Sequence, residues 1–354
     1  MFDMFNLAIS DAPEYNNERL VGRPVNAVIL TCMQTTSGRV FFNNEEINTH
    51  FKAMFDVWKD FLSTDQSQHV LNQVDGWLSP NSLQRLIISK YNDPNPDDPK
   101  ETLSFTEAYA CDPNDKYFGF KSWDKFFVRE FKSKDVRPLP LPGPDSDDSL
   151  ITCACESHLY RIAPGVQLND EFWIKDKAYS LQEIFDNDVE SAKKFVGGTI
   201  FQTYLSPRDY HHWHSPVKGT IEKIVKVQGS YYSVYDSENF DPAANEQSVG
   251  FLPHVATRVL IWIKPNNPKI GERVCFVGIG MFEVSSCDVS VGVNSKVNNG
   301  DELGMFHFGG SSHCLIFQKD AKIEFLPKWG SSYIDPNKTK LVMVNSRIAT
   351  VKQN

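Results

Sequence analysis

Long apolar runs are missing from the 354-residue sequence: no stretch of eighteen or more apolar residues occurs, so no transmembrane helix is predicted. The first twenty residues have neither the basic start of a secretory signal nor the Arg-rich character of a mitochondrial presequence. Clusters of Lys and Arg are also missing, and the formal net charge is −9. An acidic chain disfavours nucleic acid and anionic lipid as partners. We therefore expect a cytoplasmic protein with no nucleic-acid partner and no integral membrane association.

Cysteine is too sparse for a disulfide framework. The seven cysteines are an odd number and lack the spacing of a metal site, so we expect reduced thiols and no bound metal. Aromatic residues, by contrast, are plentiful, with 25 Phe and 7 Trp, and hydrophobic residues make up 41% of the chain. This composition predicts a globular protein with a sizeable core.

Helical patterns dominate the first third of the chain. Asn43-Asn44 could cap a helix whose apolar residues recur at three- and four-residue steps and which ends near Ser63. A second helix is expected from Ser79 to residue 91 and a third over residues 122–131. Two proline-rich segments are expected to be irregular: a surface loop at 92–100 and a linker between subdomains at 137–148.

Short β-rich runs follow residue 150, separated by Gly, Pro, Asn and Asp. They are expected at 150–155, 198–204, 219–227, 259–263, 274–279, 287–291 and 313–317, with one short helix at 180–186. We predict an α+β fold in which a helical N-terminal region packs on a mostly antiparallel, β-rich domain. The expected boundaries are a tail at 1–22, a helical domain at 23–120 and the β-rich domain at 121–354.

Three histidines stand within four residues in the segment 204–219, YLSPRDYHHWHSPVKG. His211 and His214 could bind a metal, although no third ligand is evident nearby. The bland alternative is a histidine-bearing strand beside a turn.

A second motif, GMFHFGGSSH, occupies residues 304–313 and places Gly309 and Gly310 directly before Ser311 and Ser312. Glycine before serine could form the nucleophile elbow of a hydrolase, but the pattern G-x-S-x-G is not present. A glycine-rich hairpin without chemistry is the alternative from the residues alone.

Together the two motifs resemble the phosphatidylserine decarboxylase family. The histidine segment resembles its signature Y-L-S-P-x-D-Y-H-x-x-H-x-P-x-x-G, and FGGSS resembles its Gly-Ser-Thr cleavage motif. Phe126-Phe127-x-Arg129 and Arg137-Pro138 match an upstream element, so the resemblance spreads over about residues 120–325. Within that family, the chain is similar to a soluble fungal subgroup of tryptophan decarboxylases.

The resemblance implies that the chain cleaves itself between Gly310 and Ser311, leaving a covalently bound pyruvoyl group derived from Ser311. His214 would be the base that activates the serine hydroxyl. Glu156 would orient His214 where the family has Asp in a P-A-D-G segment. The products, residues 1–310 and 311–354, would stay associated as the β and α chains of one precursor.

In the reaction that this resemblance implies, the pyruvoyl carbonyl takes the substrate amine and draws electrons as CO₂ leaves. His211 is the candidate acid that reprotonates the substrate carbon. His307, Gly309 and Ser312 are candidates for substrate or loop contacts, and His212 is expected to be exposed.

The expected substrate is a small-molecule aromatic amino acid, with L-tryptophan favoured by the subgroup likeness. Two alternatives stay open. The chain could make phosphatidylethanolamine from phosphatidylserine, or it could be a non-catalytic binding protein that retains the fold.

Overall fold

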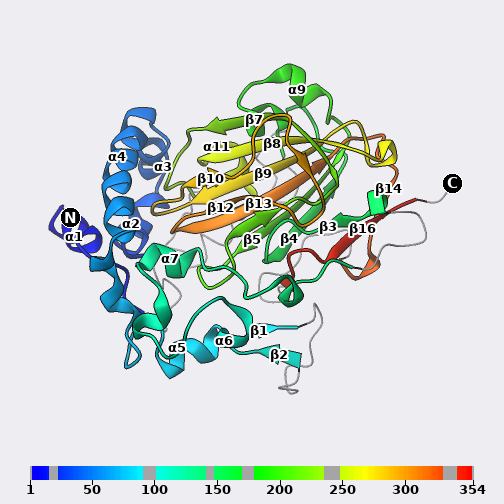
Figure 1. Cartoon of the computed structure of the whole chain (residues 1–354). Coiled ribbons are helices and arrows are strands. Elements are labelled where there is room, and N and C mark those ends of the chain that lie inside the picture. The colour runs from blue at the N-terminus through cyan, green and yellow to red at the C-terminus, as the bar shows by residue number, and fades with distance from the viewer. Residues whose placement is uncertain are drawn as a thin grey trace.

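The computed structural model describes residues 2–15, 23–90, 101–140, 147–169, 179–234, 248–329 and 341–352. In this part of the chain, helices gather beside a β-rich body, and all the strand pairs of the body are antiparallel (Figure 1). The predicted α+β fold is confirmed. The predicted loop at 92–100 and part of the predicted linker lie outside the described residues.

A helical layer is formed by α1 Phe2–Ile9, α2 Pro24–Met33, α3 Thr36–Phe42, α4 Glu45–Leu62 and the 3₁₀ helix η1 Asp65–Leu71. Helix α4 begins and ends as predicted, because the Asn44 side chain accepts a hydrogen bond from Ile47 N and Ser63 is the C-cap. Its apolar stripe, with Phe55 and Trp58, is buried.

Two predicted helices are shorter than expected. Helix α5, Pro80–Arg85, has the predicted Ser79 cap but stops before β1 Ile88–Ser89, which pairs with β2 Thr102–Leu103. Helix α7, Trp123–Phe127, ends before the predicted residue 131, because the following residues bond to residues 108–110, at the end of α6 (Phe105–Ala108) and just after it. There Ala110 N donates to Glu130 O and Lys132 N donates to Ala108 O, both at 2.9 Å. Tertiary pairing thus overrides helix propensity at the C-terminal ends of both α5 and α7.

The main sheet has eight strands in the order β11-β7-β8-β9-β13-β5-β4-β15. Their bounds are β4 Ser157–Pro164, β5 Thr199–Leu205, β7 Gly219–Val227, β8 Arg258–Pro265, β9 Val274–Met281, β11 Lys296–Val297, β13 Gly310–Phe317 and β15 Leu341–Val342. Strand β13 lies between β9 and β5 near the middle of the sheet. It begins three residues before the predicted start at 313, so the second motif enters the sheet itself.

Two three-stranded sheets complete the body. One has the order β10-β12-β6, with β10 Cys287–Val289, β12 Glu302–Phe306 and β6 His212–His214; the other has the order β14-β16-β3, with β14 Ile323–Phe325, β16 Arg347–Val351 and β3 Ile151–Thr152. Strand β3 is shorter than the run predicted at 150–155. Short helices α8 Leu181–Ile184, α9 Val189–Lys193 and α11 Leu252–Val255 lie in the connections.

Both faces of β13 are buried. Leu315 and Phe317 belong to the core shared with the small sheets, whereas Cys314 and Ile316 belong to the core shared with the helical layer. Side chains of a strand alternate between its faces, so Ser311 shares the face of Leu315 and Ser312 shares the face of Cys314. The two adjacent serines therefore enter different environments.

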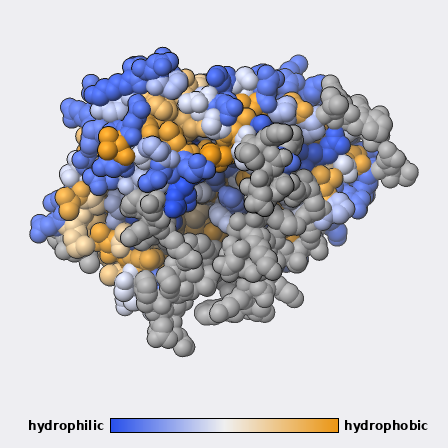
Figure 2. All heavy atoms as spheres, turned by 90° about the horizontal axis from the view of Figure 1, so that it is seen from below, coloured by the Kyte–Doolittle hydropathy of each residue, from blue (hydrophilic) through white to orange (hydrophobic). Residues whose placement is uncertain are grey.

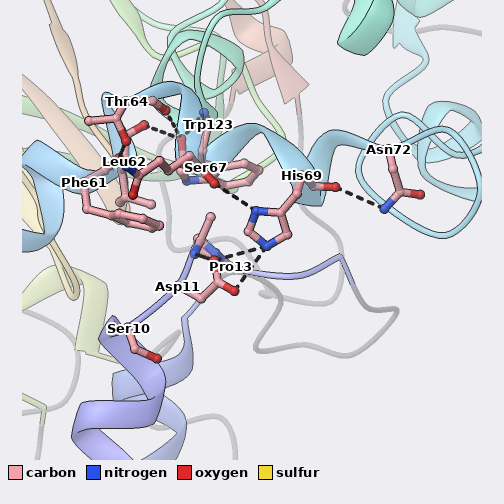
Figure 3. A network of polar contacts seen from close by, with 12 residues as sticks. Ser10, Asp11, Pro13, Phe61, Leu62, Thr64, Ser67, His69, Asn72 and Trp123 are labelled. Atoms are coloured by element: carbon pink, nitrogen blue, oxygen red, sulfur yellow. Dashed lines mark hydrogen bonds and ion pairs between the residues drawn. The ribbon is translucent and has the colours of Figure 1, made fainter.

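The start of the chain is anchored to the helical layer. Trp58 Nε1 donates to Asp11 O at 2.9 Å, and Trp77 Nε1 donates to Pro13 O at 2.7 Å. Figure 3 shows His69 of η1 beside Asp11, with 3.1 Å between Nε2 and the carboxylate. Residues 2–15 of the predicted tail thus form helix α1 and an anchored segment.

Within the described residues, no helix is both long enough and apolar enough to cross a membrane. On the face shown in Figure 2, hydrophilic and hydrophobic residues are interspersed around the grey, undescribed segments.

Candidate active site

Ser311 is the first residue of β13 to pair on both sides, opposite Leu205 of β5 and Gly280 of β9. Its side chain is buried, and Oγ has no hydrogen-bond partner in the described part of the chain. A buried hydroxyl without a partner costs about 1–3 kcal/mol, so such groups are rare unless a function requires them. Among the described residues, the hydroxyl is therefore both desolvated and unpaired.

The turn before Ser311 requires glycine at one position by its backbone conformation. Gly309 has φ 143°, and a Cβ there would lie 2.9 Å from Phe282 O. Gly310 does not have a left-handed backbone, but a Cβ would lie 3.0 Å from the Phe282 ring. Side chains are thus disfavoured at both positions before the serine, at Gly309 by backbone conformation and contacts and at Gly310 by contacts alone.

His214 lies in β6, opposite Glu302 of β12. Its Nδ1 is 2.8 Å from Gly300 O, and its Nε2 is 3.0 Å from the Tyr210 hydroxyl. A carbonyl can only accept, so Nδ1 carries the proton and Tyr210 donates to Nε2. Burial lowers the pKa of His214, which leaves the ring neutral at neutral pH.

Glu156 does not make the predicted contact with His214 in this conformation. Its carboxylate forms a buried two-point ion pair with Arg137, with Nη2–Oε1 at 2.6 Å and Nε–Oε2 at 2.8 Å. Val344 N also donates to Oε2 at 3.0 Å. The backbone brings the two segments together nevertheless, because His214 N donates to Ala154 O at 2.8 Å. Arg137, flagged in the sequence only as part of an Arg-Pro match, is the partner that sequence reasoning missed.

His211 lies at the other end of β12 from His214. Its carbonyl accepts a hydrogen bond from Phe306 N at 3.0 Å, and its ring stacks on Phe127 with 3.9 Å between centroids. Phe127 in turn packs edge-on against Phe308 in the turn before the cleavage motif. The ring is buried without a hydrogen bond to the described residues, and burial lowers its pKa well below the usual value. His211 is thus a neutral, desolvated imidazole near the Gly309 turn.

Arg129 positions the loop that leads to His211. Its buried guanidinium donates to the carbonyls of Arg208 and Asp209, the latter at 3.1 Å, and stacks over Tyr109 at 4.4 Å. This contact gives the FFxR element a structural role, which the sequence did not specify.

The expectation that His212 is exposed is wrong. Its ring is buried, with Nδ1 3.1 Å from Glu302 Oε2 and Nε2 3.0 Å from Val128 O. The carbonyl of Val128, the residue after α7, and the carboxylate of Glu302 in β12 come from segments distant in the sequence, which a local pattern cannot reveal.

His307 bridges two carboxylates. Nδ1 is 2.7 Å from Asp124 Oδ1, and Nε2 is 2.9 Å from Asp288 Oδ2. Burial lowers the pKa of His307, but the two hydrogen-bonded carboxylates outweigh it and raise the pKa to about 9. The imidazolium therefore ties α7 and β10 to the Gly309 turn, and both ring nitrogens are occupied.

Ser312 points away from Ser311 and bonds to β5. Its hydroxyl donates to Thr203 O at 2.6 Å and accepts from Gln202 Nε2 at 3.2 Å. These bonds hold the start of β13 in register with β5.

A cavity of about 470 Å³ opens beside His214. Its lining includes Arg137, Tyr210, Glu302 and Asn345. Among the described residues, no group of three or more His, Cys, Asp or Glu side chains could hold a metal ion.

Comparison with known proteins agrees with the motifs. A phosphatidylserine decarboxylase family model matches residues 123–338, and a second model of the same description matches residues 1–86. L-tryptophan decarboxylase from Psilocybe cubensis is 35% identical over 99% of this chain and 78% of that protein. The chain belongs to the phosphatidylserine decarboxylase family. It is accordingly a carboxy-lyase, and the predicted family resemblance is confirmed.

Other members of the phosphatidylserine decarboxylase family show how the likeness is distributed. The decarboxylase iboD from Amanita muscaria is 39% identical over 87% of this chain and 87% of that protein. Phosphatidylserine decarboxylase proenzyme 2 from Oryza sativa subsp. japonica is 32% identical over 65% of this chain and 35% of that protein. The two fungal relatives thus match the helical layer as well as the β-rich body.

Proposed function

We propose that this decarboxylase cleaves itself between Gly310 and Ser311, carries the resulting pyruvoyl group, and converts an aromatic L-amino acid to its amine and CO₂. L-tryptophan is the first substrate to test. The observation that carries the proposal is the buried Ser311 hydroxyl, which has no partner among the described residues and lies beside a glycine turn.

Self-cleavage begins when Ser311 Oγ bonds to the Gly310 carbonyl carbon and the peptide C–N bond breaks, with the hydroxyl proton ending on the Ser311 nitrogen. Loss of the Ser311 Cα proton then breaks the Cβ–Oγ bond and leaves a carboxylate on Gly310. Water finally replaces the nitrogen, which departs as ammonia. Backbone pairing to β5 and β9 holds residue 311 on both sides during these steps.

The site fits a pyruvoyl group, because Ser311 Oγ is unpaired and the positions before it exclude side chains. The group would supply the electron sink for decarboxylation. We propose that His214 accepts the Ser311 proton, since burial keeps its ring neutral and Gly300 O fixes the proton on Nδ1. The Tyr210 hydroxyl must give up its bond to Nε2 for this transfer.

Two further roles complete the proposal. His211 would return a proton to the substrate carbon, since it is a neutral imidazole that holds one ring proton in a desolvated place. Glu156 would act as a positioning residue through Arg137 and Val344. A His214→Ala variant should remain whole, whereas a His211→Ala variant should cleave but release no CO₂.

The two products would remain associated. Strand β13 of the 311–354 chain pairs along its length with β5 and β9, and β16 pairs with β3. Separating the chains would break these ladders and expose both cores.

An aromatic amino acid is favoured because L-tryptophan decarboxylases from two Psilocybe species match 97–99% of this chain, whereas the rice phosphatidylserine decarboxylase matches 65%. Phosphatidylserine is the second candidate, supported by the family models. A cytoplasmic location belongs to the same proposal, and its support is that all seven cysteines are free thiols.

Mass spectrometry of purified protein tests cleavage: we expect chains 1–310 and 311–354, with a ketone in place of the first amino group, and a Ser311→Ala chain that stays whole. A single uncleaved chain that retains activity would overturn the mechanism. Substrate choice is tested by CO₂ release from tryptophan, phenylalanine, tyrosine, ornithine and phosphatidylserine liposomes. Release from liposomes alone would favour the second candidate.

A further inference from the structure

The turn at residues 282–285 lies against the peptide that is to be cleaved. Phe282, Glu283 and Ser285 have left-handed backbones, with φ of 59°, 41° and 45°. Non-glycine residues rarely adopt this conformation, and it persists only where the surroundings hold the backbone in place. Contacts with neighbouring elements must therefore hold this turn.

Direct contacts join the turn to the cleavage motif. Ser285 N donates to Phe308 O at 2.8 Å, and Ser285 Oγ donates to Phe282 O. The Phe282 carbonyl and ring occupy the space that side chains at 309 and 310 would need. The position of the turn thus limits where the Gly309–Gly310 backbone can lie.

Glu283 ties the same turn to the helical layer. Its buried carboxylate accepts a hydrogen bond from Asn26 N in the first turn of the ten-residue helix α2, at 3.0 Å to Oε1. The Tyr232 hydroxyl donates to Oε2 at 2.9 Å, and Glu283 N donates to that hydroxyl at 3.2 Å. An acid at a helix N-terminus also interacts favourably with the helix dipole. Arg23, just before α2, lies over the Phe282 ring at 5.6 Å.

We propose that Glu283 is a positioning residue for self-cleavage: by binding the first turn of α2, it fixes the turn at 282–285 against Gly309 and Gly310. The helical layer then sets the geometry of the peptide before Ser311. This inference rests on the proposed self-cleavage and adds a role for the region before the β-rich body.

Ionisation of Glu283 gives the proposal a second readout. Burial raises the pKa of Glu283 to about 7, against the lowering effect of the bonds from Asn26 and Tyr232 and of the Arg23 charge. Arg23 and Tyr232 are the titratable groups that face the carboxylate. A carboxylate binds N–H and O–H donors more strongly than a carboxylic acid does, so cleavage should accelerate between about pH 6 and 8. Burial shifts the titration of His214 below its ordinary pKa, which is the direction opposite to the shift of Glu283.

The experiment follows self-cleavage of pulse-labelled full-length chain made by cell-free translation, with samples resolved on denaturing gels. Glu283→Ala should slow cleavage by about tenfold or more, and Tyr232→Phe by about threefold. Glu283→Gln keeps a donor and an acceptor in the same shape, so it should cleave within about threefold of the wild type and lose the rise between pH 6 and 8. Glu45→Gln is the matched control, because it removes an exposed acid from the first turn of α4 and should change nothing.

The outcomes separate the two proposals. Wild-type cleavage rates in both Glu283→Ala and Tyr232→Phe would overturn the positioning role and leave self-cleavage standing. Failure of the wild-type chain to cleave would overturn the proposed function instead. Should Glu283→Ala fail to fold, the pH profile of Glu283→Gln decides: a flat profile supports the proposal, and a wild-type profile refutes it.

Discussion

Replacing the adjacent serines 311 and 312 by alanine should have different consequences: the first change should abolish self-cleavage, and the second should lower stability. Ser311→Ala removes a buried hydroxyl that bonds to no described residue, so the chain should stay whole and lose no stability. Ser312→Ala, made in the same uncleavable background, removes the bonds to Thr203 O and from Gln202 Nε2. It also leaves the buried Thr203 carbonyl without that donor.

The size of the second effect follows from these two bonds. Losing a buried hydrogen-bonded hydroxyl costs about 1–3 kcal/mol of unfolding free energy. The entropy of unfolding is about 2 cal/mol/K per residue, so the melting temperature of a chain of this length should fall by roughly 1–4 °C.

Calorimetry and intact-mass measurement on the two uncleaved proteins provide the assay. We expect one mass for each, with a lower Tm for the chain that lacks both hydroxyls. Cleavage of the Ser311→Ala chain would show that another residue is the nucleophile. Equal melting temperatures would show that the Ser312 hydroxyl does not hold β13 to β5.

Three other predictions follow, each measured in purified protein. Glu156→Gln in the uncleavable background should lower the unfolding free energy by about 3–5 kcal/mol, because it unpairs buried Arg137. The double variant Glu156→Leu, Arg137→Met should recover most of that loss in thermal melts. A Glu156→Gln chain as stable as its parent would refute the contribution of the ion pair. Stabilisation by protonated His307 should be fully present below about pH 6.5 and lost as the pH rises through about 9. The change in unfolding free energy should be about 3 kcal/mol in denaturant titrations. His307→Gln should abolish it, and the same pH dependence in the variant would contradict this reasoning. Gly309→Ala should block self-cleavage, as followed on denaturing gels. The control Gly165→Ala, where φ is 72° and no atom lies within 4 Å of the new Cβ, should cleave normally despite a similar backbone cost. Normal cleavage of Gly309→Ala would refute the steric argument.

The sequence predicted those helices and motifs that depend only on neighbouring residues. Helix α4 was predictable at both ends because its cap, Asn44, and its apolar spacing lie within the helix and beside it. The two motifs likewise located Ser311, His211 and His214, since the resemblance depends on residue types in a fixed order. The two predicted helices that ended too late were decided by strand pairing with segments elsewhere in the chain.

Partners distant in the sequence were decided only by the tertiary structure. Glu156 binds a backbone amide 188 residues away, and His307 binds a carboxylate 183 residues away. The sequence of the segment 282–285 does not predict its three left-handed residues, because it contains neither glycine nor asparagine. The sequence by itself indicated which residues could carry the chemistry, because that depends on side-chain type. The fold decided which charges are neutralised, which rings are desolvated and which hydroxyl stays unpaired, because these properties depend on what surrounds each group.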